Sequence, residues 1–188
     1  MGAPPRSKVT AEQLIVRVLG AGDASLVQTF TCGEADLDDF VRTDALRLQT
    51  HGVVRCYLAF FGAELVGYMA VLSDAIVLET KERKRLALGA GDHPIVPAVK
   101  IARLGVSEPF RRTHAGVGTA LVHIAHAMAL DIADRVGCRL LTVDAYPESV
   151  AFYERLGFVP NRAKPYRDRE HPSMRLDILL PAPPSWAT

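Results

Sequence analysis

The sequence has few cysteines, no long apolar run and no excess of charge of one sign. Its cysteines, Cys32, Cys56 and Cys138, are odd in number and far apart, which excludes a disulfide framework and a zinc-binding pattern. The 22 basic residues nearly balance the 21 acidic ones, so the whole molecule is not a polycation that coats nucleic acid. No stretch approaches the roughly 18 apolar residues of a membrane-spanning helix, and no apolar signal core stands near the beginning. These absences predict a cytoplasmic protein that does not enter a membrane.

The length and the residue pattern predict one domain between two short ends. A chain of 188 residues without an internal repeat or linker fits a single hydrophobic core. Residues 1–10 and 181–188 are polar or rich in proline, so we expect flexible ends around a domain of residues 11–180. Apolar runs and helical spacing predict a helix over 34–50 and strands over 14–19, 54–61, 65–78 and 174–180.

The stretch 99–158 has the most informative order of elements. An apolar strand over 99–106 ends before Pro109, because proline has no N–H to donate to a sheet. An Arg-rich turn and a Gly-x-Gly then open an amphipathic helix over 116–136, which Gly137 is expected to close. A second strand and a short helix follow, at 140–143 and 148–156.

The turn before the long helix is suited to bind an anion. The N–H groups at a helix N-terminus lack partners within the helix, and the helix dipole adds positive partial charge. Gly116 and Gly118 let the backbone approach a ligand closely, and Arg111 and Arg112 add charge beside it. An isolated glycine pair is also found in turns that only permit tight helix packing, and for the motif alone this alternative stays open. The strand before it and the helix after it favour a phosphate site.

Residues 111–121, followed by Ala-Phe-Tyr-Glu-Arg-Leu-Gly-Phe at 151–158, resemble the GNAT family of N-acetyltransferases, which use acetyl-CoA. The resemblance covers roughly residues 10 to 180 and implies an α/β (α+β) fold. In such a single domain, a central mixed, mostly antiparallel sheet is flanked by helices, and its splayed middle strands form the acetyl-CoA cleft. The pantetheine arm would pair with the first of these strands as an added strand does. The residues implied to bind acetyl-CoA are Leu104, Gly105, Val106, Arg111, Arg112, Thr113, His114, Ala115, Gly116, Val117, Gly118 and Thr119, and no metal is implied.

The pyrophosphate loop departs from the family pattern by one residue. That pattern reads Gln/Arg-x-x-Gly-x-Gly/Ala, whereas the position three before Gly116 is Thr113, and Arg112 stands one residue further back. The loop is therefore one residue longer than the family pattern, and the additional residue lies within Thr113-His114-Ala115. Contacts through backbone N–H groups are still expected, and the role of the Arg112 side chain stays open.

The resemblance matches Tyr153 to the family's tyrosine that hydrogen-bonds the departing CoA sulfur. A phenol is a suitable proton donor for a thiolate leaving group. The alternative is a core tyrosine whose hydroxyl is capped by backbone. The implied reaction is direct transfer, in which a deprotonated primary amine attacks the thioester and backbone donors near Val106 stabilise the oxyanion. Glu108 and Asp144 are the candidates for a general base, and neither has a distinctive signature.

A closer resemblance is to the acetyltransferase toxins of bacterial toxin–antitoxin pairs, which acetylate the amino group of aminoacyl-tRNA. It is carried by short pieces: Cys32-Gly33, Leu37-Asp38-Asp39-Phe40, Gly67-Tyr68 and Pro97-Ala98-Val99. It implies aminoacyl-tRNA as the acceptor and an antitoxin protein as a partner. Two basic clusters would then meet tRNA, namely Lys81, Arg83, Lys84 and Arg85, and Arg162, Lys164, Arg167 and Arg169. Charge runs of this kind also form solvated loops, and the near-neutral total charge counts against tRNA.

Two other functions stay open. One is an acetyltransferase for a small-molecule amine or a protein N-terminus. The other is a non-catalytic, CoA-binding regulatory module that kept the fold. The acceptor, the existence of an antitoxin and the formation of a homodimer are not decided by the sequence.

Overall fold

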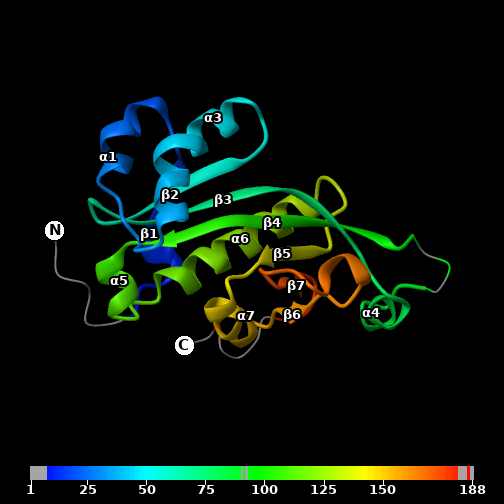
Figure 1. Cartoon of the computed structure of the whole chain (residues 1–188). Coiled ribbons are helices and arrows are strands. Elements are labelled where there is room, and N and C mark those ends of the chain that lie inside the picture. Colours follow the sequence, from blue (N-terminus) through cyan, green and yellow to red (C-terminus); the bar gives the residue numbers. More distant parts are fainter. Residues whose placement is uncertain (1–7, 90, 92, 182–185, 187–188) are drawn as a thin grey trace. The chain divides into compact units, whose positions relative to one another are not determined.

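The computed structural model describes residues 8–89, 91, 93–181 and 186 (Figure 1). These residues form two compact units, one of residues up to 72 with 102–124, and one of residues 73–101 with 125 onward. Strands β3 (Glu64–Val77) and β4 (Ile95–Val106) and helix α6 (Val117–Ala133) run through both units. None of the helices in the described residues combines the length and apolarity needed to span a membrane.

The two expected flexible ends lie largely outside the described residues, which omit 1–7, 182–185 and 187–188. Val9 differs from that expectation, because its side chain is buried and its N–H donates to the carbonyl of Ala115 at 2.6 Å. The packed part of the first unit therefore begins before the predicted boundary at residue 11.

The first unit carries strands in the order β1-β2-β3-β4. Strand β1 (Leu14–Val18) pairs antiparallel with β2 (Arg55–Phe61), which pairs antiparallel with β3. Gly62 has a φ of 60° in the hairpin turn between β2 and β3, a conformation that favours glycine. The helical elements that lie wholly in this unit are η1 (Ala11–Gln13), η2 (Ala21–Asp23), α1 (Ala24–Gln28), α2 (Ala35–Asp39), η3 (Phe40–Asp44), α3 (Ala45–Thr50) and α5 (Glu108–Arg112).

The helix predicted over 34–50 is present but is interrupted. Its middle, η3, is a single π turn between α2 and α3, and α1 lies beside it (Figure 1). Such turns are rare in proteins and occur often at functional sites. The helix ends at Thr50, and Gly52 follows with a φ of 71°.

Tyr68 is fully buried and organises the core of the first unit. Its hydroxyl donates to the carbonyl of Leu37 at 2.7 Å, and its ring contacts Phe30 edge-on and Phe40 in a stacked arrangement. A Cβ placed on Gly105 of β4 would lie only 2.5 Å from this ring. Position 105 therefore requires glycine, because β3 places the ring of Tyr68 against β4 at this point.

The second unit carries strands in the order β4-β5-β7-β6. Strand β5 (Leu140–Asp144) runs parallel to β4, whereas β7 (Ser173–Asp177) runs antiparallel to β5 and to the short β6 (Val159–Pro160). Its helical elements are α4 (Thr80–Arg85), η4 (Pro147–Ser149), α7 (Val150–Arg155) and η5 (Lys164–Tyr166). Its core includes Ile76, Leu78, Leu86, Val96, Ala98 and Leu140. The described strands follow the order β1-β2-β3-β4-β5-β7-β6, which confirms the predicted mixed, mostly antiparallel sheet.

Two local predictions were wrong. Helix α6 ends at Ala133 rather than near residue 136, so Val136 is 69% exposed and Gly137 does not adopt the left-handed conformation of a helix-closing glycine. The expected Arg-rich turn contains helix α5, which has proline in its first turn, where a missing N–H is tolerated. The first basic cluster, for which the sequence predicted no element, lies on helix α4, whose Glu82 is buried.

Candidate active site

The end of β4 is free to accept a partner strand on one side. Its register with β5 runs from Ala98 opposite Leu140 to Ile101 opposite Val143 and ends there. Strand β4 continues to Val106, and the next N–H, that of Ser107, donates to the carbonyl of Val66 on β3 at 2.9 Å. The backbone of residues 104–106 thus belongs to a strand that is fixed by β3 beyond the last pair with β5.

The loop after α5 reverses the chain through two residues with positive φ. His114 has a φ of 51° and Gly116 a φ of 86°. A Cβ on Gly116 would lie 3.0 Å from the carbonyl oxygen of Val9, so glycine also leaves room for the crossing N-terminal segment. The N–H of Ala115 donates to the carbonyl of Phe110 at 3.1 Å. The left-handed His114 lies within the Thr-His-Ala segment in which the sequence departs from the family pattern.

Four consecutive N–H groups open helix α6 without acceptors. Within the described part of the chain, the N–H groups of Gly116, Val117, Gly118 and Thr119 make no hydrogen bond, and the first bonded one is that of Ala120, at 3.0 Å from the carbonyl of Gly116. They stand at the N-terminus of a 17-residue helix. This arrangement fits a phosphate group, as the sequence predicted.

The side chains around this loop divide into two groups. Ala115 and Val117 are 4% and 1% exposed, so only their backbone can meet a ligand. Arg111, Arg112, Thr113 and His114 are exposed. Thr113 is engaged locally, because its hydroxyl donates to the carbonyl of Pro109 at 3.0 Å.

Both arginines of the loop are paired with carboxylates. Arg111 Nη1 lies 3.0 Å from Glu34 Oε1, and Arg112 pairs with Glu108 one helical turn earlier. The Glu34 partner was missed by the sequence reasoning, because 77 residues separate it from Arg111 and no local signal connects them. Glu108, one of the two candidate bases, is therefore already bound to a cation.

Tyr153 lies in α7 of the second unit and is 6% exposed. Its ring packs edge-on against Phe152 and Phe158. No hydrogen bond of its hydroxyl is found among the described residues, so the backbone cap that would mark a purely structural tyrosine is not seen there. Burial raises the pKa of Tyr153 above its ordinary value, which keeps the hydroxyl protonated and able to donate.

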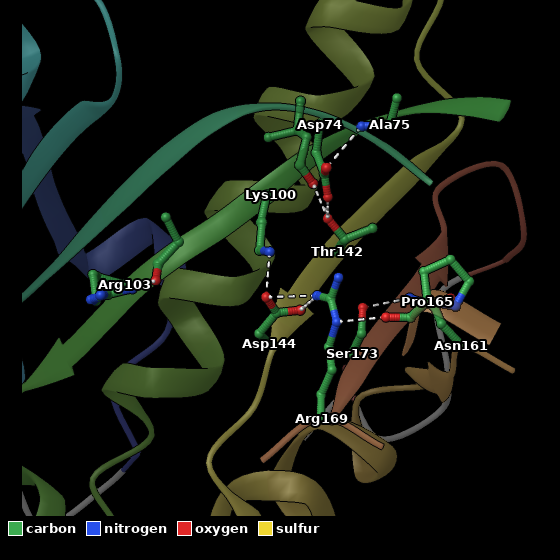
Figure 2. A network of polar contacts seen from close by, with 12 residues as sticks. Asp74, Ala75, Lys100, Arg103, Thr142, Asp144, Asn161, Pro165, Arg169 and Ser173 are labelled. Atoms are coloured by element: carbon green, nitrogen blue, oxygen red, sulfur yellow. Dashed lines mark hydrogen bonds and ion pairs between the residues drawn. The ribbon is translucent and has the colours of Figure 1, made fainter. Parts of the chain in front are cut away.

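Asp144, the other candidate base, is held at the end of β5 between two cations. Lys100 Nζ lies 2.5 Å from Asp144 Oδ2, and Arg169 Nη1 lies 3.4 Å from the same oxygen (Figure 2). Arg169 also donates from Nε to the carbonyl of Pro165 at 3.0 Å, and its guanidinium stacks on the ring of Tyr166. Asp144 is thus an ion-pair partner rather than an unoccupied carboxylate.

The structure brings the two predicted basic clusters together within the second unit. Buried Glu82 of α4 accepts hydrogen bonds from Arg175 Nη1 at 2.7 Å and from the N–H of Arg162 at 3.1 Å. Glu79 pairs with Arg167. Burial lowers the pKa of Arg175, and the positive charges of Arg85 and Arg162 lower it further while Glu82 opposes this. The exposed basic side chains of this surface, which we call the basic face, are Lys81, Lys84, Arg85, Arg162, Lys164, Arg167 and Arg169.

Cysteine and metal chemistry have no support in the described residues. Cys32, Cys56 and Cys138 are buried free thiols, and burial raises the pKa of each. No group of three or more His, Cys, Asp or Glu side chains in the described residues is placed to hold a metal ion.

The family model of the acetyltransferase (GNAT) domain matches residues 23–174. The chain is a GNAT acetyltransferase. This confirms the enzyme class and acetyl-CoA as the cosubstrate that the sequence predicted. A curated relative, the tRNA-acetylating toxin of Mycobacterium tuberculosis, is 30% identical over 137 residues, which are 72% of this chain and 80% of the relative.

Solved structures show the same GNAT fold. The toxin AtaT complexed with acetyl-methionyl-tRNAfMet matches with a TM-score of 0.72 and 22% identity, over 87% of this chain and 94% of that one. A tyrosine-to-phenylalanine mutant of KacT matches with a TM-score of 0.73 and 21% identity, over 88% and 95%. A mutant AtaT bound to acetyl-CoA and the C-terminus of the antitoxin AtaR matches with a TM-score of 0.68 and 22% identity, over 88% and 94%.

Proposed function

We propose that this acetyltransferase acts in the cytoplasm as a toxin, acetylating the amino group of aminoacyl-tRNA, and that an antitoxin protein restrains it. The observation that carries the acceptor assignment is the basic face, which joins two clusters that are far apart in the sequence. The 30% identical relative is named for the same activity, and AtaT is seen with an acetylated aminoacyl-tRNA and with an antitoxin segment.

The cofactor half of the reaction follows from the first unit. The four unbonded N–H groups at residues 116–119 would hold the pyrophosphate of acetyl-CoA, with Arg111 and Arg112 beside it. The backbone of Leu104, Gly105 and Val106 would pair with the pantetheine arm, because β4 continues there beyond its last pair with β5. Acetyl-CoA supplies the activated acetyl thioester.

Tyr153 would donate its proton to the leaving thiolate as the amine nitrogen forms its bond to the acetyl carbon. Its buried, protonated hydroxyl, for which no hydrogen bond is found among the described residues, supports this role. The replacement Tyr153→Phe removes only the hydroxyl and leaves the ring contacts with Phe152 and Phe158 in place. The rate of acetyl transfer should fall by about 100-fold or more, whereas the Kd of acetyl-CoA should change little.

The basic face is suited to a polyanion for physical reasons. Lysine and arginine side chains bind RNA phosphates without regard to sequence, and the affinity falls as salt rises. The buried pair of Glu82 and Arg175 fixes both clusters in one place, which a pair of independently moving loops would not achieve. Glu79, Asp168 and Glu170 reduce the net charge of this surface, so its contribution to affinity is expected to be moderate.

The deciding experiment compares acceptors under identical conditions. Purified enzyme and acetyl-CoA are mixed with charged tRNA, uncharged tRNA, polyamines or peptides, and thiol release is measured. Charged tRNA should give the highest kcat/KM, and deacylated tRNA should give none. Preference for a polyamine or peptide would replace the toxin assignment by a small-amine or N-terminal acetyltransferase. Absence of thiol release with every acceptor would favour a non-catalytic CoA-binding module.

A charge reversal tests the basic face itself. The double variant Lys84→Glu, Arg162→Glu should raise the KM for charged tRNA and weaken its salt dependence. The matched control is Arg135→Glu, because Arg135 is 74% exposed in the same unit and pairs only with Asp131 among the described residues. If the two variants have equal KM values for charged tRNA, the basic face is not part of the tRNA-binding site.

A further inference from the structure

Arg103 stands on β4 directly before the segment proposed to hold the pantetheine arm, and Figure 2 shows its side chain projecting from this strand. Its side chain is exposed. The arginines of the first unit that flank the cofactor loop are neutralised by Glu34 and Glu108. Arg103, in contrast, pairs with no carboxylate among the described residues, and its guanidinium donates only to the neighbouring carbonyl of Ala102 at 2.8 Å.

The guanidinium of Arg103 is held in place by an aromatic stack. It lies 5.5 Å from the ring centre of Phe40, and Phe40 stacks at 6.3 Å and 17° on Tyr68. Tyr68 is fully buried and hydrogen-bonded to Leu37, so the stack is anchored in the core. Phe40 is the first residue of the π turn η3. An arginine positioned over a ring loses less freedom when it binds an anion than a freely moving side chain does.

We infer that Arg103 binds a backbone phosphate at the 3′ end of the acceptor aminoacyl-tRNA, an inference that rests on the proposed function. A guanidinium matches the geometry of phosphate oxygens, and nothing described in the first unit neutralises this one. The phosphates of CoA are expected elsewhere, at the unbonded N–H groups of residues 116–119. With the pyrophosphate at residues 116–119 and the pantetheine arm along residues 104–106, as proposed, residue 103 would lie toward the thioester end of the cofactor, where the acceptor arrives.

The test compares two acceptors that carry the same amino acid. One is charged tRNA, and the other is the aminoacyl ester of adenosine, which has no phosphate. In Arg103→Gln, the ratio of kcat/KM for charged tRNA to kcat/KM for the aminoacyl-adenosine should fall by about ten-fold, as expected for one lost charge-assisted hydrogen bond. The slope of log kcat/KM for tRNA against log salt should become shallower by about 0.7, the value for one single-strand phosphate.

Three further measurements separate the alternatives. Arg55→Gln is the matched control, since Arg55 is exposed in the same unit on β2, and it should leave the ratio and the slope unchanged. Arg103→Lys keeps the positive charge but lacks the planar guanidinium. It should therefore keep the wild-type salt slope for charged tRNA, whereas the ratio of kcat/KM for charged tRNA to that for aminoacyl-adenosine should fall. If Arg103→Gln weakens the Kd of acetyl-CoA relative to the wild type but leaves the Kd of 3′-dephospho-acetyl-CoA unchanged, the arginine binds the cofactor and the inference is overturned.

The inference and the proposed function fail in different ways. If the wild-type enzyme does not acetylate charged tRNA, the proposed function is wrong and the inference falls with it. If the wild-type enzyme acetylates charged tRNA, and Arg103→Gln matches it in the acceptor ratio and the salt slope, only the inference is wrong.

Discussion

The contact between Gly105 and Tyr68 predicts that one added methyl group will disturb the cofactor strand. In Gly105→Ala, the new Cβ would lie 2.5 Å from Tyr68 Cε1 and 3.0 Å from Cδ1, well inside the 3.4 Å of ordinary contact. The ring cannot withdraw easily, because its hydroxyl is bonded to Leu37 and its faces are packed. Gly105 does not have a positive φ, so the effect is steric rather than conformational. Overpacking of this kind costs about 1–3 kcal/mol of the free energy of unfolding.

Urea and thermal unfolding measure this loss. For a chain of this size, 2 kcal/mol corresponds to a Tm lower by about 4–8 °C. The control is Gly22→Ala, because a Cβ added at Gly22 would meet nothing within 4 Å and the φ of this residue is not positive. In a Tyr68→Ala background the ring is absent, so adding Gly105→Ala should cost at least about 1 kcal/mol less than it does in the wild type. If Gly105→Ala unfolds like Gly22→Ala, the reasoning from the Tyr68 contact is refuted.

Three other substitutions test ion pairs of the structure. Glu82→Gln should lower the free energy of unfolding by about 3–5 kcal/mol in urea titrations, because it removes the negative charge that pairs with buried Arg175 and leaves only the neutral acceptors Asn161 and Pro160, and a smaller loss would contradict this. Asp23→Asn should lower Tm at neutral pH, because hydrogen bonds from Arg17 hold the pKa of Asp23 below its ordinary value; this stabilisation is present above about pH 4 and is lost as pH falls through the folded pKa, so the two Tm values should converge in acid. Glu34→Gln should lower the Kd of acetyl-CoA in calorimetry by up to about five-fold at low salt, because it frees an arginine of the cofactor loop, and an unchanged Kd would speak against that arginine as a ligand.

Elements defined by local patterns were predicted correctly. The β2–β3 hairpin has a glycine turn between two apolar runs, and helix α6 begins one residue after Gly116, as the motif indicated. Helices α4 and α5 are six and five residues long, too short to show a helical period in the sequence. The end of α6 was placed three residues too late, because the apolar Val136 continues the helical spacing although it is exposed.

Contacts between residues far apart in the chain could not be predicted. The two basic clusters were correctly identified as surface features, but their union depends on Glu82 and Arg175, which are separated by 93 residues. Glu82, which lies among the basic residues of the first cluster, is only 3% exposed. A buried carboxylate inside a run of exposed charges has no local signature, since the same letters occur in solvated helices.

The ion pairs of the two candidate bases affect how the acceptor amine becomes a nucleophile. Neither carboxylate considered as the base is free, because Glu108 pairs with Arg112 and Asp144 with Lys100 and Arg169. An acceptor amine that is already partly deprotonated at neutral pH depends less on either of these paired carboxylates. Lysine-like amines have an ordinary pKa near 10.4 and are almost fully protonated at neutral pH, whereas α-amino groups titrate near 8. The ester carbonyl of an aminoacyl-tRNA withdraws electrons from its amine and lowers that pKa further. The pairing of Glu108 and Asp144 is thus in keeping with the proposed aminoacyl-ester acceptor, whose amine needs a base less than a polyamine or a lysine side chain does.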